Sequence, residues 1–234
     1  MSSTPTPRSI PLALTGLVAL FSALVALALS GGMNMAQAHG NAPAAMTMHS
    51  PAQTPKAVAL RMEMRKLWED HITWTRLAII SLEGGTPDTS ATVARLLRNQ
   101  VDIGNAFKPY YGKATGDAAT KLLREHILIA ADLIAAAKAG DGTKLADAQS
   151  RWVANADQIA AALHSINPFW TLGAMKAEMH RHLDLTTQEA VARLQQDWTG
   201  DVVAYDRVHV HILHMADMLT AGIVHQFPKR FGHR

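Results

Sequence analysis

Residues 56–82 read KAVALRMEMRKLWEDHITWTRLAIISL, and this stretch decides the class of fold. Apolar side chains and one histidine recur in it at spacings of three and four residues, at Leu60, Met64, Leu67, His71, Trp74, Ala78 and Leu82. That period places them on one face of an α-helix. The sequence therefore predicts a long amphipathic helix whose inward stripe carries His71.

The rest of the chain repeats this pattern, and turn residues divide it into further helices. The predicted helices span residues 56–82, 89–107, 117–139, 143–165, 171–185 and 187–226. Lys108-Pro109 is expected to end the second helix, because the residue before a proline disfavours helical backbone. Thr186-Thr187-Gln188-Glu189 has the pattern of a capping box that starts the last helix, in which we expect a break near Gly200-Asp201. The fold class predicted is an all-α bundle of five to seven helices.

Two blocks recur in the same order and suggest that the bundle consists of two pseudo-symmetric halves. VARL at residues 93–96 recurs at 191–194, and HILxxAD at 126–132 recurs at 211–217. A weaker match pairs His71 with His182. The alternative is coincidence among helices that are rich in alanine and leucine.

The first 38 residues are predicted to be an export signal. Arg8 precedes an apolar run from Leu12 to Leu29, and Ala36-Gln37-Ala38 supplies the small residues for cleavage after Ala38. The run is close to the ~20 residues that span a bilayer, so an uncleaved anchor in the inner membrane is the alternative. We therefore expect the protein in the periplasm or outside the cell. The chain then divides into a signal peptide, a flexible leader, the bundle domain and a basic tail, at residues 1–38, 39–55, 56–228 and 229–234.

The composition narrows the possible functions. The chain has no cysteine, which excludes disulfides, thiolate metal sites and cysteine nucleophiles. Its formal net charge of +3 comes from scattered lysine and arginine and is too weak for a nucleic-acid surface. Glycine-rich phosphate loops and the GxSxG and HExxH motifs do not occur in the sequence. The residue type that stands out is histidine, with twelve copies.

Several histidines fall on inward helical stripes, and acids or further histidines lie three or four residues away on the same faces. Imidazole and carboxylate together suit copper, zinc and other transition metals, and the sequence does not choose among them. The Glu-x-x-His spacing of di-iron carboxylate proteins does not occur. The candidate ligands of a metal site inside the bundle are His71, His126, His182, His211, His214, Glu69, Glu178 and Asp217.

The leader offers a second possible metal site. Cleavage after Ala38 would leave His39 as the first residue, where the α-amine and a ring nitrogen can chelate one copper ion. Met46, Met48 and His49 add donors that suit Cu(I). The alternative is that this segment is only a spacer.

Three blocks of the sequence resemble an uncharacterised group of bacterial all-helical proteins. They are LWEDHITWTR at residues 67–76, DIGNA at 102–106 and HILHMADMLT at 211–220. The resemblance spans about residues 60–228. It implies a single helical domain and adds no activity.

The leading hypothesis is an exported, non-enzymatic protein that binds copper or zinc. It requires that imidazoles from distant parts of the chain meet inside the fold. The second hypothesis is a structural or interaction module of the cell envelope, in which the histidines are buried hydrogen-bond partners. The third is a small metalloenzyme, which would need an open coordination position. A metal ion is the expected partner, nucleic acid is not, and membrane contact is expected only if the signal segment is retained.

Overall fold

The computed structural model describes residues 54–232. They form α2 (Pro55–Gly84), α3 (Thr89–Tyr111), α4 (Lys113–Ala139), α5 (Gly142–Ile166), α6 (Leu172–Leu194), α7 (Trp198–Gln226) and a 3-10 helix, η1 (Pro228–Phe231). This part of the chain contains no strand, which confirms the predicted all-α bundle. The predictions for the signal segment and for His39, Met46, Met48 and His49 of the leader lie outside the described residues.

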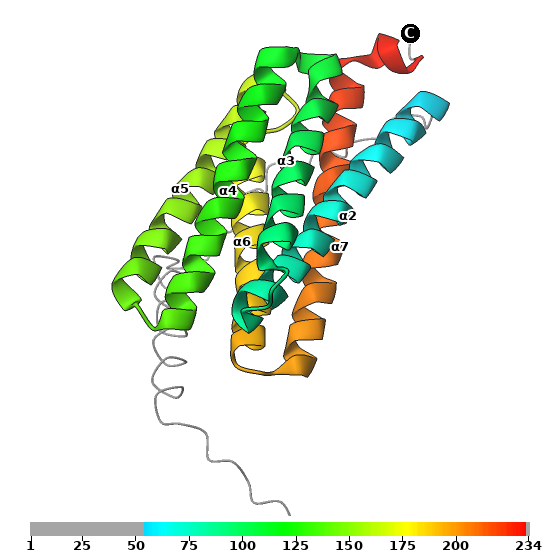
Figure 1. Ribbon diagram of the computed structural model, residues 1–234. Helices are drawn as coiled ribbons and strands as arrows, with labels where there is room; N and C mark the ends of the chain where they lie inside the picture. Colours follow the sequence, from blue (N-terminus) through cyan, green and yellow to red (C-terminus); the bar gives the residue numbers. More distant parts are fainter. Residues whose placement is uncertain (1–53, 233–234) are drawn as a thin grey trace, which may run out of the picture.

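The helices run alternately up and down, and each packs against the next (Figure 1). Helix α7 also packs against α2, so the first and last helices of the described part lie side by side. Helix α5 lies at the opposite edge, against α4 and α6. None of the helices within residues 54–232 combines the length and apolar character that crossing a membrane requires.

Polar side chains and glycines fix where the helices start and stop. Two glycines end α-helices with left-handed backbone, Gly85 at φ 63° and Gly140 at φ 70°, a conformation that costs glycine little. First-turn amides, which have no partner within a helix, donate to the side chains of Thr54, Asp141, Thr171 and Asp197.

Small residues let two pairs of elements approach closely inside the core. A Cβ on Gly104 of α3 would lie 2.6 Å from the carbonyl oxygen of Gly116 on α4, so these two backbones touch without side chains between them. Gly222 of α7 faces the indole of Trp170, which is completely buried. A larger residue at either glycine would force these neighbours apart.

One helix end differs from the prediction because proline is tolerated there. Helix α3 continues through Pro109 to Tyr111. A proline in the last turn removes one backbone hydrogen bond without interrupting the helix before it.

The capping-box interpretation of residues 186–189 was wrong. Helix α6 runs through this segment to Leu194, and Glu189 is fully buried rather than bonded to a cap amide. Thr186 Oγ1 donates to the carbonyl of His182 at 2.9 Å, a bond within the helix. The break between the last two helices falls at residues 195–197, before the expected Gly200-Asp201, and Gln196 has a φ of 61° there.

The duplication stays a prediction. The repeated blocks and the paired histidine of the first half lie on α2, α3 and α4, whereas their counterparts lie on α6 and α7. A duplication would therefore require that the second half has lost a helix or fused two.

Candidate functional site

Histidines from four helices meet in the interior of the bundle. His71 of α2, His126 of α4, His182 of α6 and His211 of α7 are each no more than 5 % exposed. His182 is central, since its ring centroid lies 5.8 Å from that of His71 and 6.2 Å from those of His126 and His211. These four residues, which we call the histidine cluster, are brought together from distant parts of the chain.

The neighbours of His71 and His126 determine which ring nitrogen carries the proton. Asn155 Nδ2 donates to the carbonyl of Leu122 at 3.2 Å, so its Oδ1 is the atom that accepts from His126 Nδ1 at 2.8 Å. A neutral His126 then has its lone pair on Nε2, which is buried and has no partner among the described residues. On His71, Nδ1 accepts from Gln100 Nε2 at 3.2 Å, so the proton of that ring lies on Nε2.

Two acceptor atoms face each other at one edge of the cluster. His211 Nε2 donates to the backbone carbonyl of Glu178 at 3.1 Å, and a neutral imidazole has only this one N–H. Its Nδ1 therefore carries a lone pair, and it lies 3.5 Å from Glu178 Oε2. That oxygen is buried and has no hydrogen-bond donor within residues 54–232. On the solvent side, His214 Nε2 lies 3.8 Å from the other carboxylate oxygen, Oε1.

Burial keeps the histidine cluster uncharged. Desolvation lowers the pKa of His71 to about 3, with a further contribution from nearby His126, and it lowers the pKa of His126 to about 4. It also lowers the pKa of His182 well below 6.5, and the other three histidines add to this effect. Burial lowers the pKa of His211 as well, against its bond to the Glu178 carbonyl. At neutral pH the rings are therefore neutral, which is the form that binds metals.

Apolar groups surround the histidine cluster. The indole of Trp68 packs edge-on against His71 with ring centroids 5.7 Å apart, and that of Trp152 packs against His126 at 5.3 Å. An apolar cavity of about 40 Å³ begins beside Trp152, one helical turn from His71 and His182. The indole N–H groups of Trp68 and Trp152 are themselves buried without an acceptor among the described residues.

Two of the predicted acids lie outside the cluster. Glu69 is on the surface, where its Oε1 accepts from His209 Nε2 at 3.2 Å. Asp217 accepts hydrogen bonds from both Arg61 and Arg65, which occupy its two carboxylate oxygens. The structure therefore brings together the four buried histidines, Glu178 and His214, and it leaves these two acids paired elsewhere.

The described residues do not form a complete metal site as they stand. Within residues 54–232, no set of three or more histidine, aspartate or glutamate side chains is arranged to hold an ion. Three ligands at the Glu178 edge would require His214 to turn toward His211. Its side chain is 64 % exposed, so solvent leaves room for that rotation.

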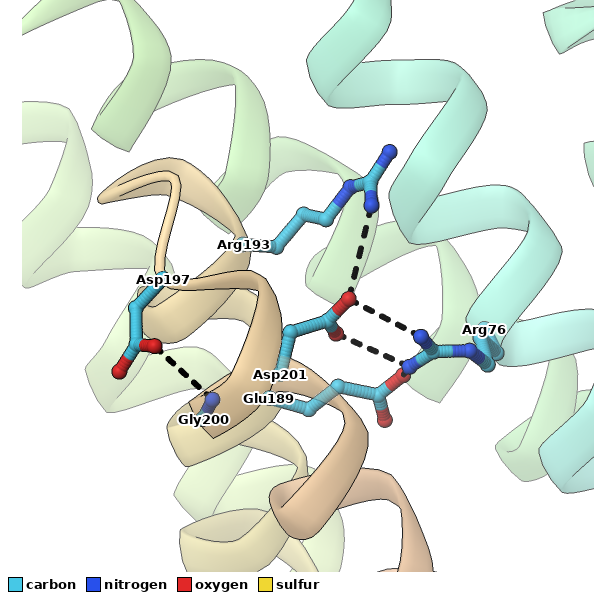
Figure 2. Close-up of polar contacts among 6 residues, drawn as sticks. All are labelled: Arg76, Glu189, Arg193, Asp197, Gly200 and Asp201. Carbon is cyan, nitrogen blue, oxygen red and sulfur yellow. Dashed lines mark hydrogen bonds and ion pairs between the residues drawn. The ribbon is translucent and has the colours of Figure 1, made fainter.

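A second buried polar cluster lies near the turn between α6 and α7. Arg76 Nη1 donates to Glu189 Oε1 at 2.8 Å and to Asp201 Oδ1 at 2.9 Å, and Nη2 donates to Asp201 Oδ2 at 2.9 Å (Figure 2). Arg193 approaches Asp201 Oδ2 at 3.5 Å from α6. We call these four residues the ion-pair cluster. It joins α2, α6 and α7, and none of its members is among the predicted site residues.

The ion-pair cluster holds more carboxyl groups than guanidinium groups when Glu83 is included. Burial raises the pKa of Glu83 to about 8 against the attraction of Arg193, and it raises the pKa of Glu189 to about 7 against its hydrogen bond from Arg76. Three carboxyl groups thus share two guanidinium groups, and at neutral pH they retain a proton among them.

Comparison of the chain with protein-family models, with curated proteins and with solved structures found no match. The resemblance to uncharacterised bacterial helical proteins stays a prediction.

Proposed function

We propose that the protein is an exported, non-enzymatic binder of a transition-metal ion, copper or zinc, at the Glu178 edge of the histidine cluster. The observation that carries this proposal is the pair of facing acceptors, His211 Nδ1 and Glu178 Oε2, 3.5 Å apart. Two ligand atoms at 2.0–2.1 Å from one tetrahedral ion lie ~3.3–3.4 Å from each other. The observed separation is close to what a shared ion requires.

Two further imidazoles can complete the coordination. His214 approaches the same carboxylate from the solvent side, and His182 lies behind the pair, with its Nδ1 buried and without a partner among the described residues. One carboxylate and up to three imidazoles form a donor set that suits zinc or copper. His71 and His126 pack against His182 and hold its ring in place.

A structural role is the second candidate, and the local partners of His71 and His126 favour it. Gln100 and Asn155 satisfy one nitrogen of each ring from a neighbouring helix. Such bonds make a core specific without any ligand. This explanation leaves the buried Nδ1 of His182 without a partner, which the proposed coordination would supply, whereas the buried Nε2 of His126 has no partner in either case.

Metal content measured on the purified full-length chain tests the proposal. The protein is incubated with excess Zn²⁺ or copper and desalted, and its metal content is measured by inductively coupled plasma mass spectrometry. We expect bound metal in the wild type and its loss in Glu178→Gln and His211→Gln, with circular dichroism to confirm that both variants fold. His180→Gln is the matched control, because His180 also pairs with an acid, Asp157, but on the surface.

The outcome separates the two candidates. Absence of metal from the wild type, or equal metal in all variants, would contradict the bundle site. A lower stability of His211→Gln without any bound metal in the wild type would favour the structural role. A further variant with His39 and His49 changed to alanine measures any metal that the leader binds on its own.

A further inference from the structure

We infer that the site selects Cu(I), a soft monovalent ion, over Zn²⁺, and that Met179 and Met215 supply thioether donors to it. This inference rests on the proposed metal site and specifies the class of ion that it takes. Three features of the described residues lead to it: the register of α6 on α7, the charge available at the site, and the softness of the donors.

Two buried methionines lie within one helical turn of the residues that form the Glu178 edge. His211 Nε2 bonds to the backbone carbonyl of Glu178, so the two helices meet at this level. Met179 is the next residue on α6 and precedes His182 by three positions, and Met215 follows His211 by four on α7. Both spacings put the methionine on the same helical face as the histidine. Their side chains are 5 % and 4 % exposed, so both lie in the interior with the histidine cluster.

The site can neutralise one positive charge. Glu178 is the carboxylate that contacts the cluster, and the buried carboxylates of Glu189 and Asp201 are already bonded to Arg76. A monovalent ion with Glu178 forms a neutral pair, whereas a divalent ion leaves one charge uncompensated. The cost of burying an ion rises with the square of its charge, so it is about four times larger for a divalent ion of the same size. Arg181 adds positive potential at His211 and opposes a divalent ion further.

The donors have the character that Cu(I) prefers. Thioether sulfur is a soft, polarisable ligand, and imidazole binds copper in either oxidation state. Structural and catalytic zinc sites instead use thiolate, imidazole and carboxylate. A site with neutral imidazoles and two thioethers beside one carboxylate therefore favours Cu(I).

Competition titrations of the full-length chain test this selectivity. Cu(I) is titrated without oxygen against the chromogenic chelator bicinchoninate, and Zn²⁺ is titrated against a zinc indicator. The variants are Met179→Leu and Met215→Leu, which nearly conserve volume, and the control is Met62→Leu, an exposed methionine on α2. Thermal denaturation establishes that each variant is folded.

We expect the wild type to bind Cu(I) more tightly than Zn²⁺. Each of the two buried substitutions should weaken Cu(I) binding by about tenfold or more and leave Zn²⁺ binding unchanged, while Met62→Leu changes neither. In a chain whose leader residues His39, Met46, Met48 and His49 are changed to alanine, X-ray absorption of the Cu(I) form should show a sulfur neighbour that is lost when Met179 and Met215 are also changed.

The results distinguish failure of this inference from failure of the proposed function. If Zn²⁺ binds as tightly as Cu(I), if no sulfur neighbour is seen, or if the methionine variants weaken both metals equally, the inference is wrong and the metal site stands. If the wild type binds neither ion, both are wrong.

Discussion

Replacing Arg76 by methionine should destabilise the protein, and more at pH 8 than at pH 5. Arg76 contacts both Glu189 and Asp201, whose side chains are 0 % and 3 % exposed. Methionine retains much of the side-chain length but leaves two carboxyl groups in the interior without their principal partner. Removing one member of a buried ion pair typically costs about 3–5 kcal/mol, and we expect a loss in this range at pH 8.

The pH dependence follows from Glu189. Its pKa in the folded protein is about 7, above the ordinary value of 4.5, so the folded state holds this proton more tightly than the unfolded chain does. The contribution of Glu189 to stability is therefore complete below pH 4.5 and declines as the pH rises through 7. Without Arg76 the folded-state pKa rises further, and the decline continues to higher pH. At pH 5 the loss should be about half as large, because Glu189 is protonated and Asp201 keeps Arg193.

Urea denaturation followed by circular dichroism at pH 5 and pH 8 measures both losses. Arg151→Met is the control, since Arg151 pairs with acids at the surface with 44 % of its side chain exposed, and its loss should stay below ~1 kcal/mol. A triple variant that adds Glu189→Gln and Asp201→Asn removes the buried charges together and should recover most of the stability. Equal losses at the two pH values would refute the reasoning and assign the effect of Arg76 to its packing on the ring of Tyr205.

Two further substitutions test the packing around the site. Asn155→Ala leaves His126 Nδ1 without a partner and removes the side-chain bond to the Leu122 carbonyl, so the free energy of unfolding should fall by about 1–3 kcal/mol in urea denaturation. A loss near zero would mean that these bonds do not hold His126. Gly222→Ala places a methyl group against the buried indole of Trp170 and should cost about 1–3 kcal/mol, whereas Gly173→Ala, where a Cβ meets nothing within 4 Å, should cause no loss.

The members of the histidine cluster could be predicted because the helical period alone shows which residues of a helix face the core. His71, His126, His182 and His211 each occupy a stripe position with apolar residues three or four away, and all four are buried. The helical period does not indicate which residue of another helix each histidine ring contacts. Gln100, which bonds His71, is 29 positions away on another helix, so only the packing of the helices pairs them.

The positions of the acids could not be predicted in this way, because they depend on partners from other helices. Glu69 and Asp217 are near candidate histidines in the sequence, but they lie on outer faces and pair with other residues. Glu189 and Asp201 continue the inward stripes of α6 and α7, so the helical period indicates that they are buried. Carboxylates, however, are rarely buried without a partner. The partner that makes their burial tolerable is Arg76, 113 positions before Glu189.

The two buried clusters lie on the same helices, and they differ in what their polar atoms can still bind. Glu189 follows His182 by seven residues, about 10 Å along α6, and the apolar cavity lies between the two levels. In the ion-pair cluster, carboxylates that could bind a metal are already bonded to guanidinium groups from within the chain. The Glu178 edge has a carboxylate and a ring lone pair facing each other, and no cationic side chain donates to either atom among the described residues. The chain neutralises the ion-pair cluster with its own cations, and at the Glu178 edge we propose that a metal ion from outside supplies the positive charge.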